Sequence, residues 1–263
     1  MCVASNKLVL LSYAIEVQKW LDDSEQGCIY FTFGSMTRIE TFPEHIVNAF
    51  YKSFANISPV RVLMKVAKPQ ELPRGLPANV MTQSWFDQIQ VLKHPNIRGF
   101  ITHGGLMSTQ ESIFYGVPMI GIPLFGDQHF NVATYVKRNI AIKIDVRDIS
   151  EKTMTDALHK ILRDSLYKKA VKRVSREFKD HLETPINTAI YWTEYIARHG
   201  KNSLRLPASD LLWWQNSLWD IYSFLITILI VLVYISYILI SIAYRMLWLQ
   251  RDHTSSPRRR KNE

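Results

Sequence analysis

The sequence has 263 residues, of which 47% are hydrophobic and 21% charged, with 10 glycines, 11 prolines and 2 cysteines. This composition excludes collagen-like, disordered and disulfide-framework proteins, and the length allows one large domain or two small ones. Residues 245–263 hold six basic and two acidic side chains, which is four of the nine net positive charges. The remaining charge is spread over a large body, so we expect no nucleic-acid partner.

Short apolar runs rich in β-formers alternate with segments of helical periodicity up to Ile149. Strands buried on both faces and separated by helices are typical of βαβ units, so the pattern predicts a parallel, doubly wound α/β sheet. The expected strands are Cys28–Phe33, Val60–Val66, Val80–Thr82, Gly99–Thr102, Met119–Ile122 and Ala141–Ile144. The helices expected between them are Glu44–Ala55, Gln88–Lys93, Met107–Tyr115 and Phe130–Lys137.

Beyond Ile149 the pattern is helical. Ser150 is a good N-cap for a helix over Glu151–Arg163, and two more helices are expected over Tyr167–Lys179 and Pro185–Arg198. We therefore expect residues 20–205 to form a single domain.

An uncharged run of 24 residues extends from Ile221 to Tyr244. As a helix it would be about 36 Å long, enough to cross a hydrocarbon core of roughly 30 Å. Aromatic side chains flank the run, as they do at membrane interfaces. They are Trp213, Trp214, Trp219 and Tyr222 on one side and Tyr244 and Trp248 on the other. The sequence thus predicts an interfacial segment over 206–220 and a transmembrane helix over 221–244.

The positive-inside rule places the basic tail, residues 245–263, in the cytosol and the body across the membrane. The last four residues, Arg260 to Glu263, resemble a dilysine-type retrieval signal, so we expect the endoplasmic reticulum membrane. A lumenal body requires a signal sequence, and the apolar run Leu8–Ile15 is short and lacks a cleavage site. The sequence is therefore typical of the C-terminal part of a longer protein, with an irregular segment over residues 1–19.

The junction after the fourth expected strand combines a glycine turn with polar side chains. The strand ends in Thr102, and two glycines precede the next helix. In open α/β sheets ligands bind at the carboxyl ends of strands, where helix N-termini and free N–H groups suit a phosphate. His103 and Ser108 can add hydrogen bonds to it, and Glu111 can accept from a pair of ribose hydroxyls. The same turn also occurs as a purely structural strand bend, so it does not identify a ligand.

The segments on both sides of this turn extend the pattern. W-F-D-Q begins at Trp85, H-P-N-I-R-G-F-I-T-H-G-G contains the turn, and G-V-P-M-I-G-I-P-L-F-G-D-Q-H-F-N ends at Asn131. Together they resemble the donor-binding signature of the UDP-glycosyltransferases, the glucosyl and glucuronosyl family, and the resemblance continues from about Trp20 to the basic tail. It implies a Rossmann-like C-terminal domain of a GT-B fold. It also implies transfer of glucose or glucuronate from a UDP-sugar to a small lipophilic acceptor.

The resemblance implies a donor site of ten residues, each in contact with one part of a UDP-sugar. They are Trp85 and Gln88 for the base and ribose, Glu111 for the ribose, His103, Gly105 and Ser108 for the diphosphate, Gly34 and Ser35 beside the phosphates, and Asp127 and Gln128 for the sugar hydroxyls. Family members often have Asn where Met107 stands, so one phosphate contact is lost or passes to the backbone. Asn131 either binds or fixes the loop.

We expect no metal or other cofactor, because the sequence has no Asp-x-Asp pair and the charge of the leaving group can fall on His103, Ser108 and a helix N-terminus. The remaining histidines have no obvious carboxylate partner, so no catalytic base is expected in this chain. They are His45, His94, His159, His181, His199 and His253, and the eighth histidine, His129, is interpreted as a surface residue.

Three interpretations stay open. The chain is the donor-binding half of a membrane-anchored glycosyltransferase whose acceptor domain and base lie in an N-terminal half. Alternatively it is a non-catalytic membrane protein that regulates full-length relatives by hetero-oligomerisation, or an unrelated nucleotide-binding membrane module. The expected partners are a UDP-sugar, a lipophilic acceptor, the membrane and a homo- or hetero-oligomer.

Overall fold

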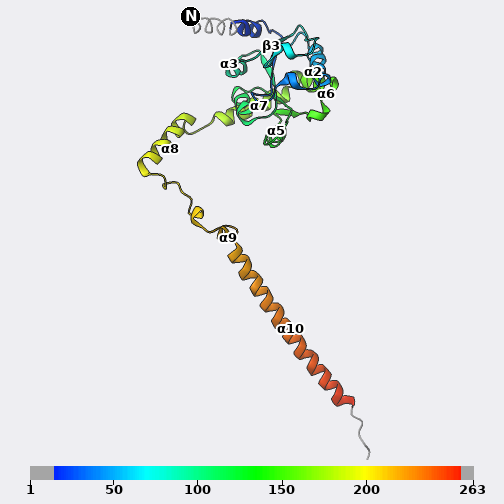
Figure 1. Ribbon diagram of the computed structural model, residues 1–263, viewed down its shortest axis with the longest axis vertical. Helices are drawn as coiled ribbons and strands as arrows, with labels where there is room; N and C mark the ends of the chain where they lie inside the picture. Colours follow the sequence, from blue (N-terminus) through cyan, green and yellow to red (C-terminus); the bar gives the residue numbers. More distant parts are fainter. Residues whose placement is uncertain (1–14, 256–263) are drawn as a thin grey trace, which may run out of the picture. The chain divides into compact units, whose positions relative to one another are not determined.

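The computed structural model describes residues 15–255, which divide after Leu182 into two compact units. Each unit is described by itself (Figure 1). The expectations for residues 1–14 and 256–263, which include most of the apolar run Leu8–Ile15 and the signal at Arg260 and Lys261, lie outside the described residues.

The first unit is a parallel sheet of six strands in the order β3-β2-β1-β4-β5-β6. The strands are β1 Cys28–Thr32, β2 Arg61–Lys65, β3 Val80–Gln83, β4 Ile97–Thr102, β5 Met119–Gly121 and β6 Ala141–Lys143. The predicted α/β class and the six predicted strands are confirmed, with ends that differ by at most two residues.

Helices cover both faces of this sheet. Each face of the sheet carries one cluster of buried hydrophobic side chains. Helices α2 Glu44–Asn56 and α6 Glu151–Arg163 pack on the first cluster, and helices α3 Gln88–Lys93, α4 Leu106–Tyr115, α5 Gln128–Lys137 and α7 Ser165–Lys179 pack on the second. The side chain of Ser150 accepts the backbone N–H of Thr153, which confirms the predicted cap of α6. The periodicity located these six helices to within two residues.

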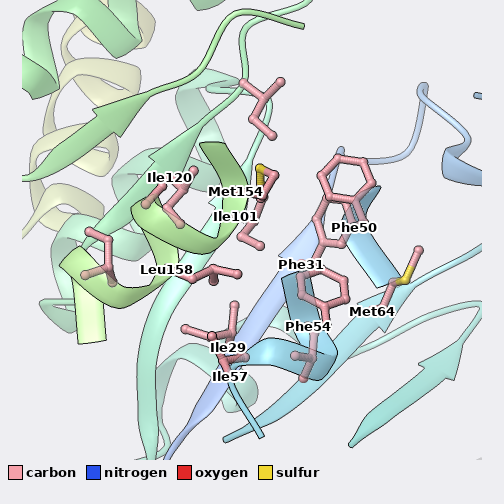
Figure 2. Packing of buried hydrophobic residues seen from close by; sticks show 14 of the residues in the cluster. Ile29, Phe31, Phe50, Phe54, Ile57, Met64, Ile101, Ile120, Met154 and Leu158 are labelled. Carbon is pink, nitrogen blue, oxygen red and sulfur yellow. The ribbon is translucent and has the colours of Figure 1, made fainter. Parts of the chain in front are cut away.

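The strand sequences assign side chains to the two faces by simple alternation. In β1, Ile29 and Phe31 enter the cluster under α2 and α6, whereas Cys28 and Tyr30 enter the other one. The Phe31 ring lies 4.9 Å from the ring of Phe50 of α2. Figure 2 shows this first cluster, in which side chains of β1, α2 and α6 point toward one another. A sheet that is buried on both faces leaves its strand ends for ligand contacts.

A helix over residues 15–22 precedes β1, so the irregular segment expected over 1–19 is wrong for residues 15–19. The Arg61 guanidinium donates to the carbonyl oxygen of Trp20 at 3.0 Å and lies 4.6 Å from the centre of its ring. Asn96 donates to the carbonyl oxygen of Leu21 at 2.9 Å. These partners come from the amino ends of β2 and β4, far along the sequence, and local periodicity does not reveal them.

The second unit begins at Glu183 and consists of α8 Pro185–His199, a 3-10 turn over Pro207–Asp210, α9 Trp213–Asn216 and α10 Trp219–Ser255. None of the side chains described in this unit is buried. The domain expected over 20–205 therefore ends earlier, at Leu182, and α8 belongs to the second unit. Within α10, Trp219–Leu247 is long and apolar enough to cross a membrane, and it includes the whole predicted run 221–244.

Candidate functional site

The carboxyl ends of β1 and β4 meet where the order of the strands reverses, which is where open α/β sheets bind ligands. Thr32 and Thr102 pair in register there. Each hydroxyl accepts the N–H of the glycine two residues on, Gly34 at 3.1 Å and Gly104 at 3.3 Å. Both glycines have a left-handed backbone, with φ of +80° and +90°. Two neighbouring strands thus end in the same Thr-x-Gly turn.

The imidazole of His103 lies between two glycine backbones. A Cβ on Gly34 would be 3.0 Å from ring Cε1, and one on Gly105 would be 2.6 Å from Nε2. Burial lowers the pKa of His103, while the charge of Asp127 opposes that shift. Within residues 15–255 the buried Nδ1 has no hydrogen-bond partner. The lowered pKa favours the neutral ring, whose one N–H can donate a hydrogen bond to an anion at the turn.

Three of the predicted polar residues form one hydrogen-bonded cluster. The side-chain amide of Gln88, at the start of α3, donates to Ser108 Oγ at 3.3 Å and to the carboxylate of Glu111, both on α4. Asp87 caps α3 by accepting the N–H of Gln90 at 3.2 Å. The cap fixes the first turn of α3 and therefore the place from which Gln88 reaches α4.

The loop between β5 and α5 carries Asp127 and Gln128, which differ in exposure. Asp127 is exposed, whereas Gln128 is buried and its Oε1 accepts the N–H groups of Leu124 and Phe125 at 2.9 and 3.0 Å. The amide oxygen of Gln128 therefore braces the loop, and Nε2 is the atom left to donate to a ligand. Asn131 Nδ2 donates to Asp127 Oδ2 at 2.8 Å and to the carbonyl oxygen of Gly104 at 3.1 Å.

Lys65, the last residue of β2, was missed by the sequence analysis. Its ammonium donates to the carbonyl oxygen of Gly34 at 3.0 Å and lies 4.6 Å from the ring centre of Trp85. The Trp85 side chain itself is 69% exposed. Partial burial lowers the pKa of Lys65. A lysine that interrupts the apolar run V-L-M-K-V at a strand end was the signal available in the sequence.

Glu40 is a second residue that the sequence analysis missed. It lies in a 3-10 turn over Ile39–Thr41, and its buried Oε1 accepts the N–H of Lys68 at 3.1 Å and the Arg38 side chain at 3.2 Å. Arg38 also pairs with Glu71 at 3.1 Å. These contacts tie the loop after β1, which contains Gly34 and the exposed Ser35, to the loop after β2.

The prediction that none of the remaining histidines has a carboxylate partner is wrong for His94. Its Nε2 lies 3.0 Å from Asp22 Oδ1, and its Nδ1 accepts the N–H of Asn96 at 3.2 Å. Since Nδ1 is an acceptor, the ring N–H is on Nε2 and donates a hydrogen bond to Asp22 Oδ1. His94 lies before the amino end of β4, at the sheet edge opposite to His103, so it does not contribute to the site.

Comparison with known proteins gives matches over most of the chain. Residues 12–252 match the family model described as UDP-glucoronosyl and UDP-glucosyl transferase. The chain is 39% identical over 213 residues to UDP-glucosyltransferase 2 of Dactylopius coccus, covering 81% of this chain and 41% of that protein. It is 34% identical over 222 residues to UDP-glucuronosyltransferase 2B7 of Homo sapiens, covering 84% of this chain and 41% of that protein. The chain therefore spans about two fifths of the length of these relatives.

Solved structures agree on the fold. The crystal structure of Os79 from O. sativa in complex with UDP aligns with a TM-score of 0.58 at 19% identity, over 69% of this chain and 42% of that one. The glycotransferase of kitacinnamycin aligns with a TM-score of 0.57 at 23% identity, over 65% of this chain and 44% of that one. The predicted Rossmann-like domain of a GT-B fold is confirmed, and the interpretation as an unrelated nucleotide-binding module is wrong. The chain belongs to the UDP-glucosyl and UDP-glucuronosyl transferase family.

Proposed function

We propose that this chain is the donor-binding half of an enzyme that transfers a glucosyl or glucuronosyl group from a UDP-sugar to a small lipophilic acceptor. One observation carries the proposal. Residues from α3 and α4 that the family resemblance links to base, ribose and phosphate form one hydrogen-bonded cluster, Gln88, Ser108 and Glu111. The Gly104 turn and His103 lie directly before the start of the same helix, α4.

The nucleotide end of the donor is matched by these groups. Trp85 offers an exposed ring to the uracil, and base–aromatic stacking contributes about 1–3 kcal/mol per base. Glu111 accepts from ribose hydroxyls, and Ser108 together with the first N–H groups of α4 donates to the phosphates. His103 adds one N–H and, when neutral, costs little to bury. These donors stabilise the UDP leaving group as its negative charge grows.

The sugar end meets Asp127 and the Nε2 atom of Gln128, an acceptor beside a donor, as neighbouring hexose hydroxyls require. Exposed apolar side chains follow the strand ends and support a lipophilic acceptor. They are Met36 after β1, Met107 after β4 and Phe130 at the start of α5, with 86, 81 and 76% of their surface exposed. We propose that Met107, like Met36 and Phe130, contacts the acceptor and not the phosphates.

Transfer also needs a base within about 3 Å of the acceptor hydroxyl. His94 is excluded by its place before the amino end of β4, and His103 is committed to the phosphate turn. We propose that the base comes from the part of the enzyme that the matched relatives contain in addition to this region. The alternative role, a non-catalytic regulator, has no specific observation in its favour.

We further propose that α10 anchors the protein in the endoplasmic reticulum membrane as a single span. The body is then lumenal and the basic tail cytosolic. The apolar surface of Trp219–Leu247, exposed throughout its length, supports the anchor. A C-terminal tag accessible to protease in sealed microsomes is the expected result, and a protected tag would contradict the topology.

The test of donor binding is calorimetry on the full chain in detergent. UDP and UDP-glucose should bind, and EDTA should leave the affinity unchanged. His103→Ala should weaken UDP and leave uridine unaffected, because uridine has no phosphate. Lack of UDP binding by the wild-type chain would overturn the proposal, and binding abolished by EDTA would overturn its metal-free form.

A further inference from the structure

We propose that Lys65 is a positioning residue of the donor site: its ammonium is anchored on the carbonyl oxygen of Gly34 and holds the Trp85 ring in the arrangement that receives the base. The inference rests on the proposed function. It concerns how the site is organised before the ligand arrives. The sequence resemblance assigned Lys65 no part in the site.

The place of Lys65 follows from the order of the strands. β2 lies between β1 and β3, and Lys65 pairs in register with Gln83, the last residue of β3. Trp85 comes two residues after that strand end, and Gly34 comes two residues after the end of β1. A long side chain at the end of the middle strand can therefore contact both neighbouring loops, and Lys65 does so at 3.0 and 4.6 Å.

Trp85 needs such a support because its own packing is sparse. With 69% of its surface exposed, the side chain gains little from the core that would select one rotamer. Stacking on a base requires a fixed ring, and binding would otherwise include the entropic cost of immobilising it. The Lys65 ammonium over the ring supplies a directional attraction that fixes it in advance.

The charge of Lys65 is used differently from that of its neighbours. Arg38 and Lys68 both pair with Glu71, whereas Lys65 has no ion pair among the side chains described in residues 15–247. Its contacts are a carbonyl oxygen and an aromatic ring, which hold the ammonium without neutralising it. Lys65 thus links the base platform to the phosphate turn with one side chain.

The experiment compares Lys65→Met and Lys65→Arg in the full chain in detergent, with uridine, UDP and pyrophosphate as ligands in calorimetry. Loss of one exposed cation–π contact corresponds to roughly a two- to fivefold change in affinity. Lys65→Met should therefore weaken uridine and UDP by the same factor of about two to five, and should leave pyrophosphate unchanged. Lys65→Arg should restore the affinity, since the charge is kept.

Two further variants isolate the mechanism. In a Trp85→Ala background, Lys65→Met should cause no additional loss of uridine affinity, because the two residues act as a unit. Lys143→Met removes the lysine that ends β6 and should change nothing. If Lys65→Met does not fold, Lys65→Gln replaces it, with the same expected loss.

The outcomes separate this inference from the proposed function. Failure of the wild-type chain to bind UDP overturns both. Wild-type affinity in Lys65→Met, or an equal loss in the Trp85→Ala background, overturns only the role of Lys65. A loss confined to UDP and pyrophosphate also overturns it, since Lys65 would then bind the diphosphate directly.

Discussion

In the first unit the large apolar side chains lie inside, and in the second they lie on the outside. Phe31, Phe50 and Leu158 have 0% of their surface exposed, whereas Leu229 and Tyr237 of α10 have 60 and 67% exposed. The first unit therefore derives its stability from contacts within the chain. In the second unit none of the described side chains is buried, and under the proposed anchor the apolar surface of α10 is covered by lipid.

The largest effect that separates the two units is expected in the core. Phe31→Ala should lower the free energy of unfolding of the first unit by about 3–5 kcal/mol, because it removes a ring packed against Phe50 and Phe54. Leu229→Ala, a similar truncation in α10, should leave that free energy unchanged. Denaturant unfolding of the full chain in detergent measures both. Equal losses would mean that the two units fold as one.

The next effect concerns insertion of α10. Leu232→Arg places a charge near the middle of the apolar span, at a cost of about 2.5–3.5 kcal/mol. The fraction that resists alkaline extraction from membranes should fall, while the UDP affinity of the first unit stays the same. Leu232→Phe is the control and should remain membrane-bound. Full retention of Leu232→Arg would contradict a spanning role for this helix.

A pair of glycines gives a sharper comparison. Gly34 and Gly200 have nearly the same φ, +80° and +83°, but an added Cβ meets the His103 ring at 3.0 Å in the first case and nothing within 4 Å in the second. Backbone strain of this kind costs about 1–3 kcal/mol. Gly34→Ala should destabilise the first unit by at least this amount and weaken UDP binding.

Gly200→Ala should leave both quantities unchanged, because its strain falls on the second unit. The measurements are unfolding free energy and calorimetry, as above. Normal UDP affinity in Gly34→Ala would show that the fit of His103 between the glycine backbones is not needed.

The smallest effect is a pH dependence carried by His103. Because burial lowers its pKa in the folded state, the unfolded chain binds more protons near the ordinary histidine pKa. The stabilisation from neutral His103 is thus fully present above a pH of about 6.5 and is lost as the pH falls through the lowered pKa. His103→Gln should remove this slope from the unfolding free energy of the first unit. Identical slopes in both proteins would exclude the effect.

The parts of the fold that depend on local pattern were predictable, and those that depend on distant contacts were not. The short apolar runs between helical segments and the Ser150 cap are local signals, so they located the sheet and α6. The hydrogen bond of Lys65 to Gly34 and that of Glu40 to Lys68 join residues 31 and 28 positions apart, and the Asp22–His94 pair spans 72. Such pairs are determined by strand order, which periodicity does not give. Whether α8 is buried likewise depends on tertiary packing.

Asn131 has a consequence for attempts to redesign the donor preference. The side-chain amide of Asn131 donates to both the Asp127 carboxylate and the carbonyl oxygen of Gly104. The same side chain therefore supports the sugar end and the phosphate end of the proposed site. An exchange of Asp127 aimed at another sugar also removes the carboxylate that orients the Asn131 amide, and so it acts on the side chain that contacts the phosphate turn. Libraries that vary Asp127 and Asn131 jointly, rather than Asp127 by itself, are the ones in which a new sugar can be accepted without loss of the turn.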